Sequence, residues 1–219
     1  LCTRLFQFFA ADEITESGEA VIGEMIEEYF GNDYSIASVL RVLYNSGYFK
    51  SDEARYARVK GPVESVVGTA RIAGSYTEPT LAVNGLWSQA LYMGQGLLAP
   101  PTVEGWHEGT EWIDSGALVE RVNFASRELG DPEKPGIQSL IDRLTYGHKG
   151  TLLPEELVDR SLDLIGPIEV DQRTREGLVR FASELGEIKV SEDECPDASR
   201  KKIANVFSMI ASTKEYQLA

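Results

Sequence analysis

The chain has 219 residues, which allow one large domain or two small ones, and its 42% of hydrophobic residues fits an ordinary globular protein. It has 21 Lys and Arg against 35 Asp and Glu, so its formal net charge is −14. That charge argues against sequence-independent binding to nucleic acid or to anionic lipid, since both would repel it. No apolar run reaches the roughly 18 residues that a membrane-spanning helix needs. We therefore expect no nucleic-acid partner and no membrane span.

The sequence also predicts no metal and no cofactor. There are only two cysteines, Cys2 and Cys195, and two histidines, with no Cys-x-x-Cys pair. The acidic run from Asp12 to Glu28 lacks the spacing of a calcium loop and is interpreted as a solvated face. The glycines of Gly94–Ala99 resemble a dinucleotide fingerprint, but they end a predicted helix instead of following a strand. The sequence leaves open whether the two cysteines form a disulfide.

The first nine residues are strongly apolar, with hydrophobic side chains at six positions. They carry no basic region and no cleavage site, so they are not a signal peptide. We predict a helix over residues 1–10 whose apolar side is covered by protein. Such a start favours a chain that begins inside a fold, with a preceding part missing. The alternative is a buried first helix of a complete protein.

Apolar residues recur at helical spacing along nearly the whole chain. In chain order, further helices are predicted at residues 17–30, 36–44, 62–70, 81–98, 115–129, 137–146, 154–165, 172–185 and 196–212. Residues 187–190 are too short a run to predict a strand. The predicted fold class is all-α, an irregular bundle of about eight to ten helices with one long loop rich in proline, glycine and tryptophan.

A linker divides the predicted bundle. Asp131–Gly136 contains two prolines and a glycine, the residues that most often interrupt helices. It separates a helical core at residues 1–130 from a helical extension at residues 131–219. We expect the extension to pack on the core, so that both form one structural unit.

The long loop, residues 100–115, holds Trp106 and Trp112 between carboxylates. Its candidate acid–base residues are Glu104, His107, Glu108, Glu111 and Asp114. One interpretation is a binding platform, in which indole faces stack on sugar rings while the acids transfer protons. The other is that the tryptophans anchor an irregular loop in the helical core. We favour the anchoring role, because no serine or cysteine in a nucleophile context accompanies His107.

A pair of opposite charges stands on an otherwise apolar predicted helix. Glu64 and Arg71 are seven residues apart and therefore lie on one face. We expect either of them to pair with Arg121 or Glu120 and so to join two helices.

Several segments stand in the order and approximate spacing of one bacterial family: Tyr44–Ser51, Val59–Arg71, Met93–Leu97, Pro100–Trp106, Trp112–Ser115 and Arg121–Ala125. In these segments the chain resembles the C-terminal half of the family called domain of unknown function 1800. The likeness is good over residues 1–130 and loose over residues 131–219, mainly through Ile210–Gln217. One departure is His107-Glu108-Gly109, where the family usually has a Pro-Gly-Gly-like stretch.

The resemblance implies a helical fold and an exported bacterial protein, periplasmic or at the cell surface. The family's proteins are typically about twice this long, which supports a missing N-terminal half. Because the family's activity is unassigned, the resemblance implies no catalytic residue.

Two function classes follow. The first is a non-catalytic interaction or assembly module of an exported protein, with Trp106 and Trp112 as binding residues. Its partner would be the missing N-terminal half or another protein chain. The alternative is a hydrolase that acts on a carbohydrate or similar polymer through the carboxylates of the 104–114 loop. We favour the module, because the residues form no complete catalytic constellation.

Overall fold

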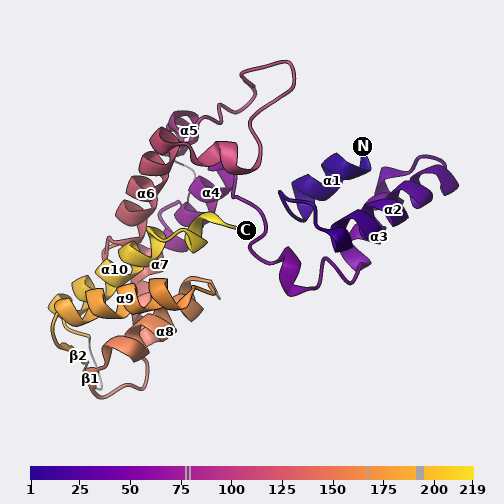
Figure 1. Ribbon diagram of the computed structural model, residues 1–219. Helices are drawn as coiled ribbons and strands as arrows, with labels where there is room; N and C mark the ends of the chain where they lie inside the picture. The colour runs from indigo at the N-terminus through magenta and orange to yellow at the C-terminus, as the bar shows by residue number, and fades with distance from the viewer. Residues whose placement is uncertain (77, 79, 167, 191–194) are drawn as a thin grey trace. The chain divides into compact units, whose positions relative to one another are not determined.

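The computed structural model describes residues 1–76, 78, 80–166, 168–190 and 195–219, and helices predominate in them (Figure 1). The α-helices are α1 (Cys2–Phe9), α2 (Glu16–Gly31), α3 (Ile36–Asn45), α4 (Pro62–Ala73), α5 (Val83–Tyr92), α6 (Ser115–Leu129), α7 (Pro135–Thr145), α8 (Pro154–Ile165), α9 (Gln172–Glu184) and α10 (Asp197–Ala211). Three short 3-10 helices accompany them: η1 (Asp52–Ala54), η2 (Gly109–Ile113) and η3 (Glu215–Gln217). The all-α prediction is confirmed. Within these described ranges no helix is both long and apolar enough to cross a bilayer.

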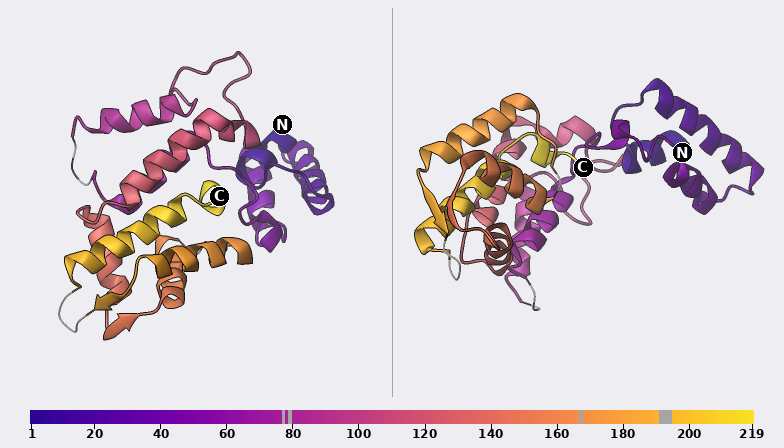
Figure 2. Two further views of the ribbon diagram at one scale, coloured as in Figure 1. Left: turned by 60° about the vertical axis from the view of Figure 1, so that its left-hand side comes forward. Right: turned by 90° about the horizontal axis from the view of Figure 1, so that it is seen from below.

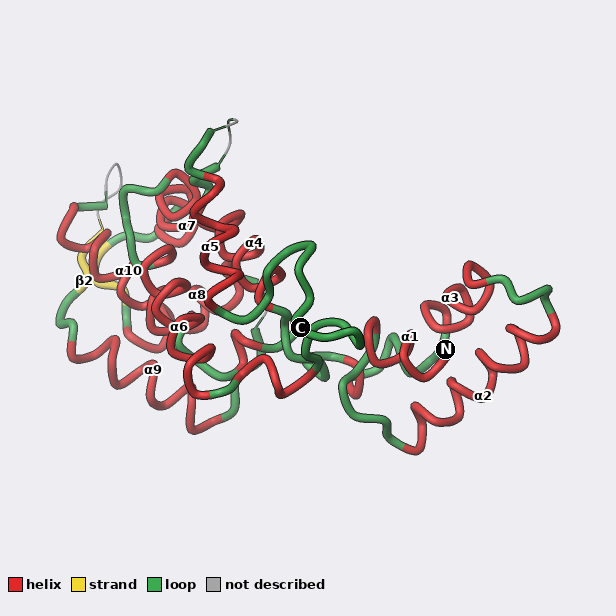
Figure 3. Tube along the Cα trace, turned by 90° about the horizontal axis from the view of Figure 1, so that it is seen from above, coloured by secondary structure: helices red, strands yellow, loops and turns green. Residues whose placement is uncertain are grey.

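A small antiparallel sheet of two strands accompanies the helices (Figure 3). Strand β1 (Gly150–Leu152) pairs with β2 (Ile188–Val190), so that Thr151 lies opposite Lys189. The prediction of no strand at residues 187–190 is therefore wrong. Ile188 and Val190 are buried whereas Lys189 is exposed, but an alternation this short becomes a strand only through its distant partner.

The chain forms two compact units. Unit 1 comprises residues 1–60, 107–112 and 218–219, and unit 2 comprises residues 61–106 and 113–217. This division differs from the predicted boundary after residue 130, which lies inside unit 2. There, residues 130–134 connect α6 to α7, and both helices pack on α4 and α10. A linker sequence looks the same whether it separates domains or only turns the chain between two helices of one core.

Unit 1 is built from α1, α2 and α3, which pack against one another. Helix α1 confirms the helix predicted at the N-terminus, and its Phe6 is fully buried, with its ring 5.1 Å from that of Tyr48. A side chain at Gly18 of α2 would meet the Phe6 ring, so the glycine allows this close packing. Protein thus covers the Phe6 side of α1, while Leu1 and Phe8 stay exposed.

Residues 107–112 and 218–219, which are far along the chain from residues 1–60, complete unit 1. The backbone of Arg58 exchanges two N–H···O bonds with Ala219, of 2.7 and 3.4 Å. Next to them, the Asp12 carboxylate accepts the backbone N–H of Val59 at 2.7 Å. Burial raises the pKa of Asp12, and the hydrogen bond from Val59 opposes that rise. Asp12 therefore departs from the solvated face predicted for the acidic run, because a chain segment far away in sequence covers it.

Unit 2 has the larger core, centred on α10. Helices α6, α7, α8 and α9 all pack against α10, which lies among them in Figures 1 and 2. One wide face of α10 buries Ile203, Ala204, Val206, Phe207, Ile210 and Ala211, whereas Met209 on the opposite side is exposed. A helix with an apolar face this wide can pack against several neighbours.

Helices α4 and α7 meet backbone to backbone at two glycines. Gly74 ends α4 with φ +69°, which favours glycine, and a side chain there would lie 2.7 Å from the nitrogen of Gly136. A side chain at Gly136 would overlap the carbonyl oxygen of Ile72. The Pro-Gly pair of the predicted linker is therefore a packing contact.

Both cysteines are free thiols and both are buried. Cys2 belongs to the core of unit 1 and Cys195 to the core of unit 2. The disulfide that the sequence left open is not formed in this structure.

Candidate functional site

The tryptophan loop is divided between the two units. Trp106 belongs to unit 2, where its indole N–H donates to the carbonyl oxygen of Gly96 at 3.1 Å and its ring is half-buried. Trp112 belongs to unit 1 and is only 7% exposed. The burial of Trp112 and the backbone hydrogen bond of Trp106 favour the anchoring role for these indoles.

Three of the predicted acid–base residues, His107, Glu108 and Glu111, belong to unit 1. His107 Nδ1 lies 3.1 Å from Glu111 Oε2, and the imidazole stands edge-on to Trp112 at 5.8 Å between ring centroids. Glu108 instead forms an ion pair of 3.6 Å with Arg4 of α1, and both side chains are exposed. His107 and Glu111 thus form a surface pair, and Glu108 joins the loop to α1.

The remaining two candidates lie in unit 2. Asp114 caps α6, since its carboxylate accepts the backbone N–H of Ala117 at 2.8 Å. Glu104 is exposed. The carboxylate of Asp114 thus satisfies a helix N-terminus, a role that its position before the predicted helix at residue 115 could have indicated.

The core of unit 2 contains a buried cation. Arg121 of α6 is 0% exposed, and its Nε donates to Gln217 Oε1 at 3.0 Å. Burial lowers the pKa of Arg121 to about 10, and the negative charge of Glu64 on α4 opposes the lowering. Arg121 therefore stays cationic at neutral pH, and Glu64 attracts it across the α4–α6 contact as predicted. Glu64 itself is exposed, whereas the bond between Arg121 and Gln217 is buried and joins α6 to the end of the chain's last helical turn.

Helix α5 presents apolar side chains to solvent. Of its ten residues only Ala90 is buried. Val83, Trp87 and Leu91 are all exposed, Trp87 to 48%, and their spacing of four residues puts them along one side of the helix. These three residues are called the α5 stripe below. Sequence reasoning missed it, because apolar residues at helical spacing normally predict a buried face.

The sequence around the α5 stripe is almost free of charge. Residues 72–103 contain one charged residue, Glu78, although 26% of the chain is charged. Exposed apolar side chains continue beyond the helix at Leu97 and Leu98. Contiguous exposed apolar surface marks interaction sites more often than single apolar residues do. The low charge of this segment was the signal that could have identified it.

Unit 2 also has an open groove of about 710 Å³ along α7. Its lining residues are Pro135, Gln138, Ser139, Asp142, Arg143, Tyr146 and Leu164. Asp142 pairs there with Arg200 of α10 at 2.8 Å. None of the residues predicted as a site from the sequence lines this groove.

The family assignment rests on a match along almost the whole chain. The family model described as "Protein of unknown function (DUF1800)" matches residues 1–218. The chain belongs to the DUF1800 family. The match includes residues 131–218, where the resemblance in sequence was loose. No curated protein and no solved structure matches this DUF1800 member. The family description assigns no activity.

Proposed function

We propose that this DUF1800 member is a non-catalytic interaction module of an exported bacterial protein, and that it binds a protein partner through the α5 stripe. The observation that carries the proposal is the stripe itself: Val83, Trp87 and Leu91 face solvent on a helix that buries only Ala90. Export rests on the resemblance to the family.

The chemistry of the stripe favours an apolar protein surface as its partner. Leu91 and Trp87 are 42% and 48% exposed, so covering the exposed part of each with protein contributes about 1 kcal/mol. The chain's net charge of −14 repels approaching acidic surfaces. Residues 72–103 carry almost no charge and add little to this repulsion. The partner is another chain or a further part of the same polypeptide.

Trp106 and Trp112 are not the binding residues in this proposal. Trp112 is buried and the Trp106 indole is held by Gly96. Trp87 instead supplies the exposed aromatic side chain typical of interface hot spots.

The hydrolase alternative has one contact in its favour, the 3.1 Å approach of His107 to Glu111. Both side chains are largely exposed, whereas carboxylic acids that transfer protons are usually tuned by burial. The test therefore includes a Glu111→Gln variant assayed for polysaccharide hydrolysis.

The test introduces a photo-crosslinking amino acid at position 87 and, as a matched control, at Tyr146. Tyr146 is an aromatic residue 86% exposed beyond the end of α7. We expect a crosslinked protein at position 87 in the source cells and none at position 146. The Trp87→Glu/Leu91→Glu variant should lose that partner, and Tyr146→Glu should keep it.

Both surface variants should melt within about 2 °C of the unsubstituted chain, since exposed positions rarely affect stability. Equal crosslinking at positions 87 and 146 would contradict the proposal. Polysaccharide hydrolysis that disappears in Glu111→Gln would favour the enzyme instead.

A further inference from the structure

The short helix η3 is unusual because all three of its residues are buried. Glu215, Tyr216 and Gln217 are 7%, 4% and 3% exposed. Consecutive side chains of a helix or a strand point in different directions. Three buried neighbours in a row therefore mean that protein surrounds this segment on several sides.

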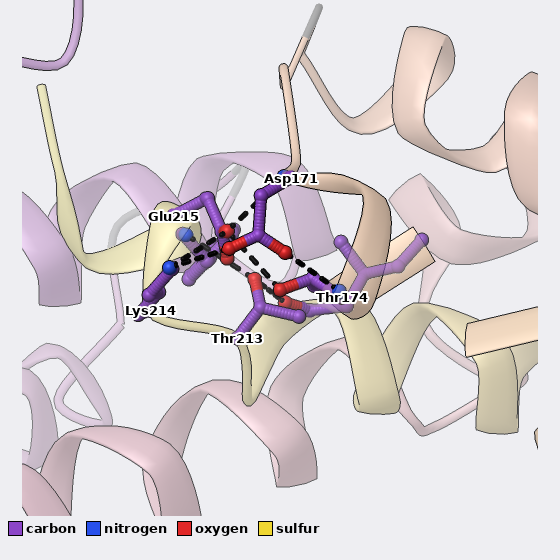
Figure 4. Close-up of polar contacts among 7 residues, drawn as sticks. Asp171, Thr174, Thr213, Lys214 and Glu215 are labelled. Atoms are coloured by element: carbon purple, nitrogen blue, oxygen red, sulfur yellow. Dashed lines mark hydrogen bonds and ion pairs between the residues drawn. The ribbon is translucent and has the colours of Figure 1, made fainter. Parts of the chain in front are cut away.

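The first contact is with α9 (Figure 4). Glu215 Oε1 accepts the backbone N–H of Asp171 at 3.4 Å and the hydroxyl of Thr174 at 3.2 Å. Asp171 itself caps α9 by accepting the N–H of Thr174 at 2.7 Å. The ammonium of Lys214 lies 2.7 Å from the other carboxylate oxygen of Asp171. Two adjacent residues thus hold the first turn of α9.

The next two residues reach other helices. The Tyr216 hydroxyl lies 2.8 Å from the hydroxyl of Thr69 on α4, and both groups are buried. Gln217 Oε1 accepts from Arg121 on α6 at 3.0 Å, and its Nε2 donates to the carbonyl oxygen of Ala211 at 3.3 Å. Four residues in a row therefore contact α9, α4, α6 and α10.

These contacts depend on one another. The Tyr216 ring belongs to the main core of unit 2, between the residues that bond α9 and α6. If Tyr216 leaves the core, its two neighbours move with it, because they are joined by consecutive peptide bonds. Detachment of Gln217 also removes a hydrogen-bond partner of buried Arg121, which raises the free energy needed to release even this one residue.

We propose that residues 214–217 form a strap that attaches to and detaches from unit 2 as one cooperative body. While attached, it holds the first turn of α9 together with α4 and α6. When it detaches, the three helices lose this shared support together. The strap is thus a conformational device of the fold, separate from the α5 stripe, and the proposal goes beyond the proposed function.

The test is amide hydrogen exchange of the full chain and two single variants, Tyr216→Phe and Gln217→Ala. Tyr216→Phe removes one hydroxyl and keeps the ring, so the fold is retained. Neither substituted side chain bonds α9, whereas the amide of Asp171 bonds the strap directly. We expect exchange at Asp171 to rise about fivefold in Tyr216→Phe, which loses one buried hydrogen bond, and by a larger factor in Gln217→Ala, which loses two.

Ser199→Ala is the matched control. The side chain of Ser199 is buried, and its hydroxyl makes one part-buried hydrogen bond in unit 2, to the carbonyl oxygen of Lys189 at 2.8 Å, outside the strap. We expect it to leave exchange at Asp171 unchanged.

Two results would contradict the proposal that the strap detaches as one cooperative body. In the first, Tyr216→Phe raises exchange only near Thr69 and Gln217→Ala only near Arg121, which means independent contacts. In the second, both variants raise exchange equally throughout unit 2, including α8, which means global unfolding without a local unit.

Discussion

The two units are stabilised in different ways. Of the ten buried polar or charged side chains in the described ranges, Ser38 is the one in unit 1 and the other nine belong to unit 2. Unit 1 relies on aromatic contacts, such as Phe6 with Tyr48 and Tyr44 with Phe49, at 5.1 and 5.0 Å between centroids. Apolar packing is non-directional, whereas a buried hydrogen bond needs a partner of defined geometry. Unit 1 should therefore tolerate similar-sized substitutions that unit 2 does not.

The largest expected effect is in the polar core of unit 2. Arg121→Ala should cost about 3–5 kcal/mol of unfolding free energy, because it opens a cavity at a fully buried position and leaves the buried Gln217 amide oxygen without its donor. Adding Glu64→Gln, which retains an acceptor for the Gly61 N–H, should restore little of the loss, because the exposed Glu64 side chain is solvated with or without the cation. Urea unfolding followed by circular dichroism measures both. A single-variant loss below about 1 kcal/mol would contradict the assigned role of Arg121.

Trp112 in unit 1 and Trp106 in unit 2 allow the same substitution to be compared in both units. Trp112→Ala should cost about 3–5 kcal/mol, because it opens a cavity in unit 1. Trp106→Ala should cost about 1–2 kcal/mol, since that half-buried ring loses less burial and one hydrogen bond. The same urea titrations measure the difference. Equal losses would mean that burial is a poor guide to the anchoring of this loop.

A conservative substitution in each unit sharpens the contrast. Phe6→Leu keeps an apolar side chain of similar size in unit 1 and should cost about 1 kcal/mol. Arg121→Lys keeps the charge in unit 2 but loses the Nε donor to Gln217, and should cost about 2 kcal/mol or more. If Phe6→Leu proves the more damaging of the two, unit 1 is the less tolerant core and the comparison fails.

The smallest expected effect is at the surface of unit 2. Lys214 and the Thr174 N–H hold the pKa of Asp171 well below its usual value. A carboxyl with a lowered folded-state pKa contributes stability above its unfolded value of about 3.9, and the contribution is lost as the pH falls through the folded-state value.

Asp171→Asn should therefore melt slightly lower than the unsubstituted chain at pH 7, and the two melting temperatures should converge in acid. Scanning calorimetry at a series of pH values measures this difference. Because the pair is exposed, 1 M salt should reduce the difference at pH 7. A difference in melting temperature that grows as the pH falls would contradict this prediction.

The sequence predicted the bounds of a helix well where both the apolar spacing and a residue that starts the helix were present. The helices predicted at residues 115–129 and 154–165 have those same bounds in the structure, because Asp114 caps the first and Pro154 begins the second. The helix predicted over residues 81–98 ends instead at Tyr92. Gly94 then has φ +96°, a conformation that cannot continue a helix.

The candidate site was less predictable than the helices. The sequence indicated candidate site residues in the tryptophan loop, but it could not predict the contacts of Glu108 with Arg4 and of Trp106 with Gly96, because they form only in the folded chain. The sequence predicted a helix over residues 81–98, and apolar residues at helical spacing normally indicate a face buried in the core. Whether such a face is buried depends on which helices pack on it, and α5 packs against α4 and α6 while Val83, Trp87 and Leu91 stay exposed.

The sequence alone therefore determined the helical class, the family and the attraction between Glu64 and Arg121, since each depends on residue type and spacing along one or two helices. The tertiary structure decided the division into two units, the exposure of the α5 stripe and the burial of Glu215–Gln217. These features arise from contacts between residues far apart in the chain. Their pattern along the sequence carries no information about which distant surface meets them.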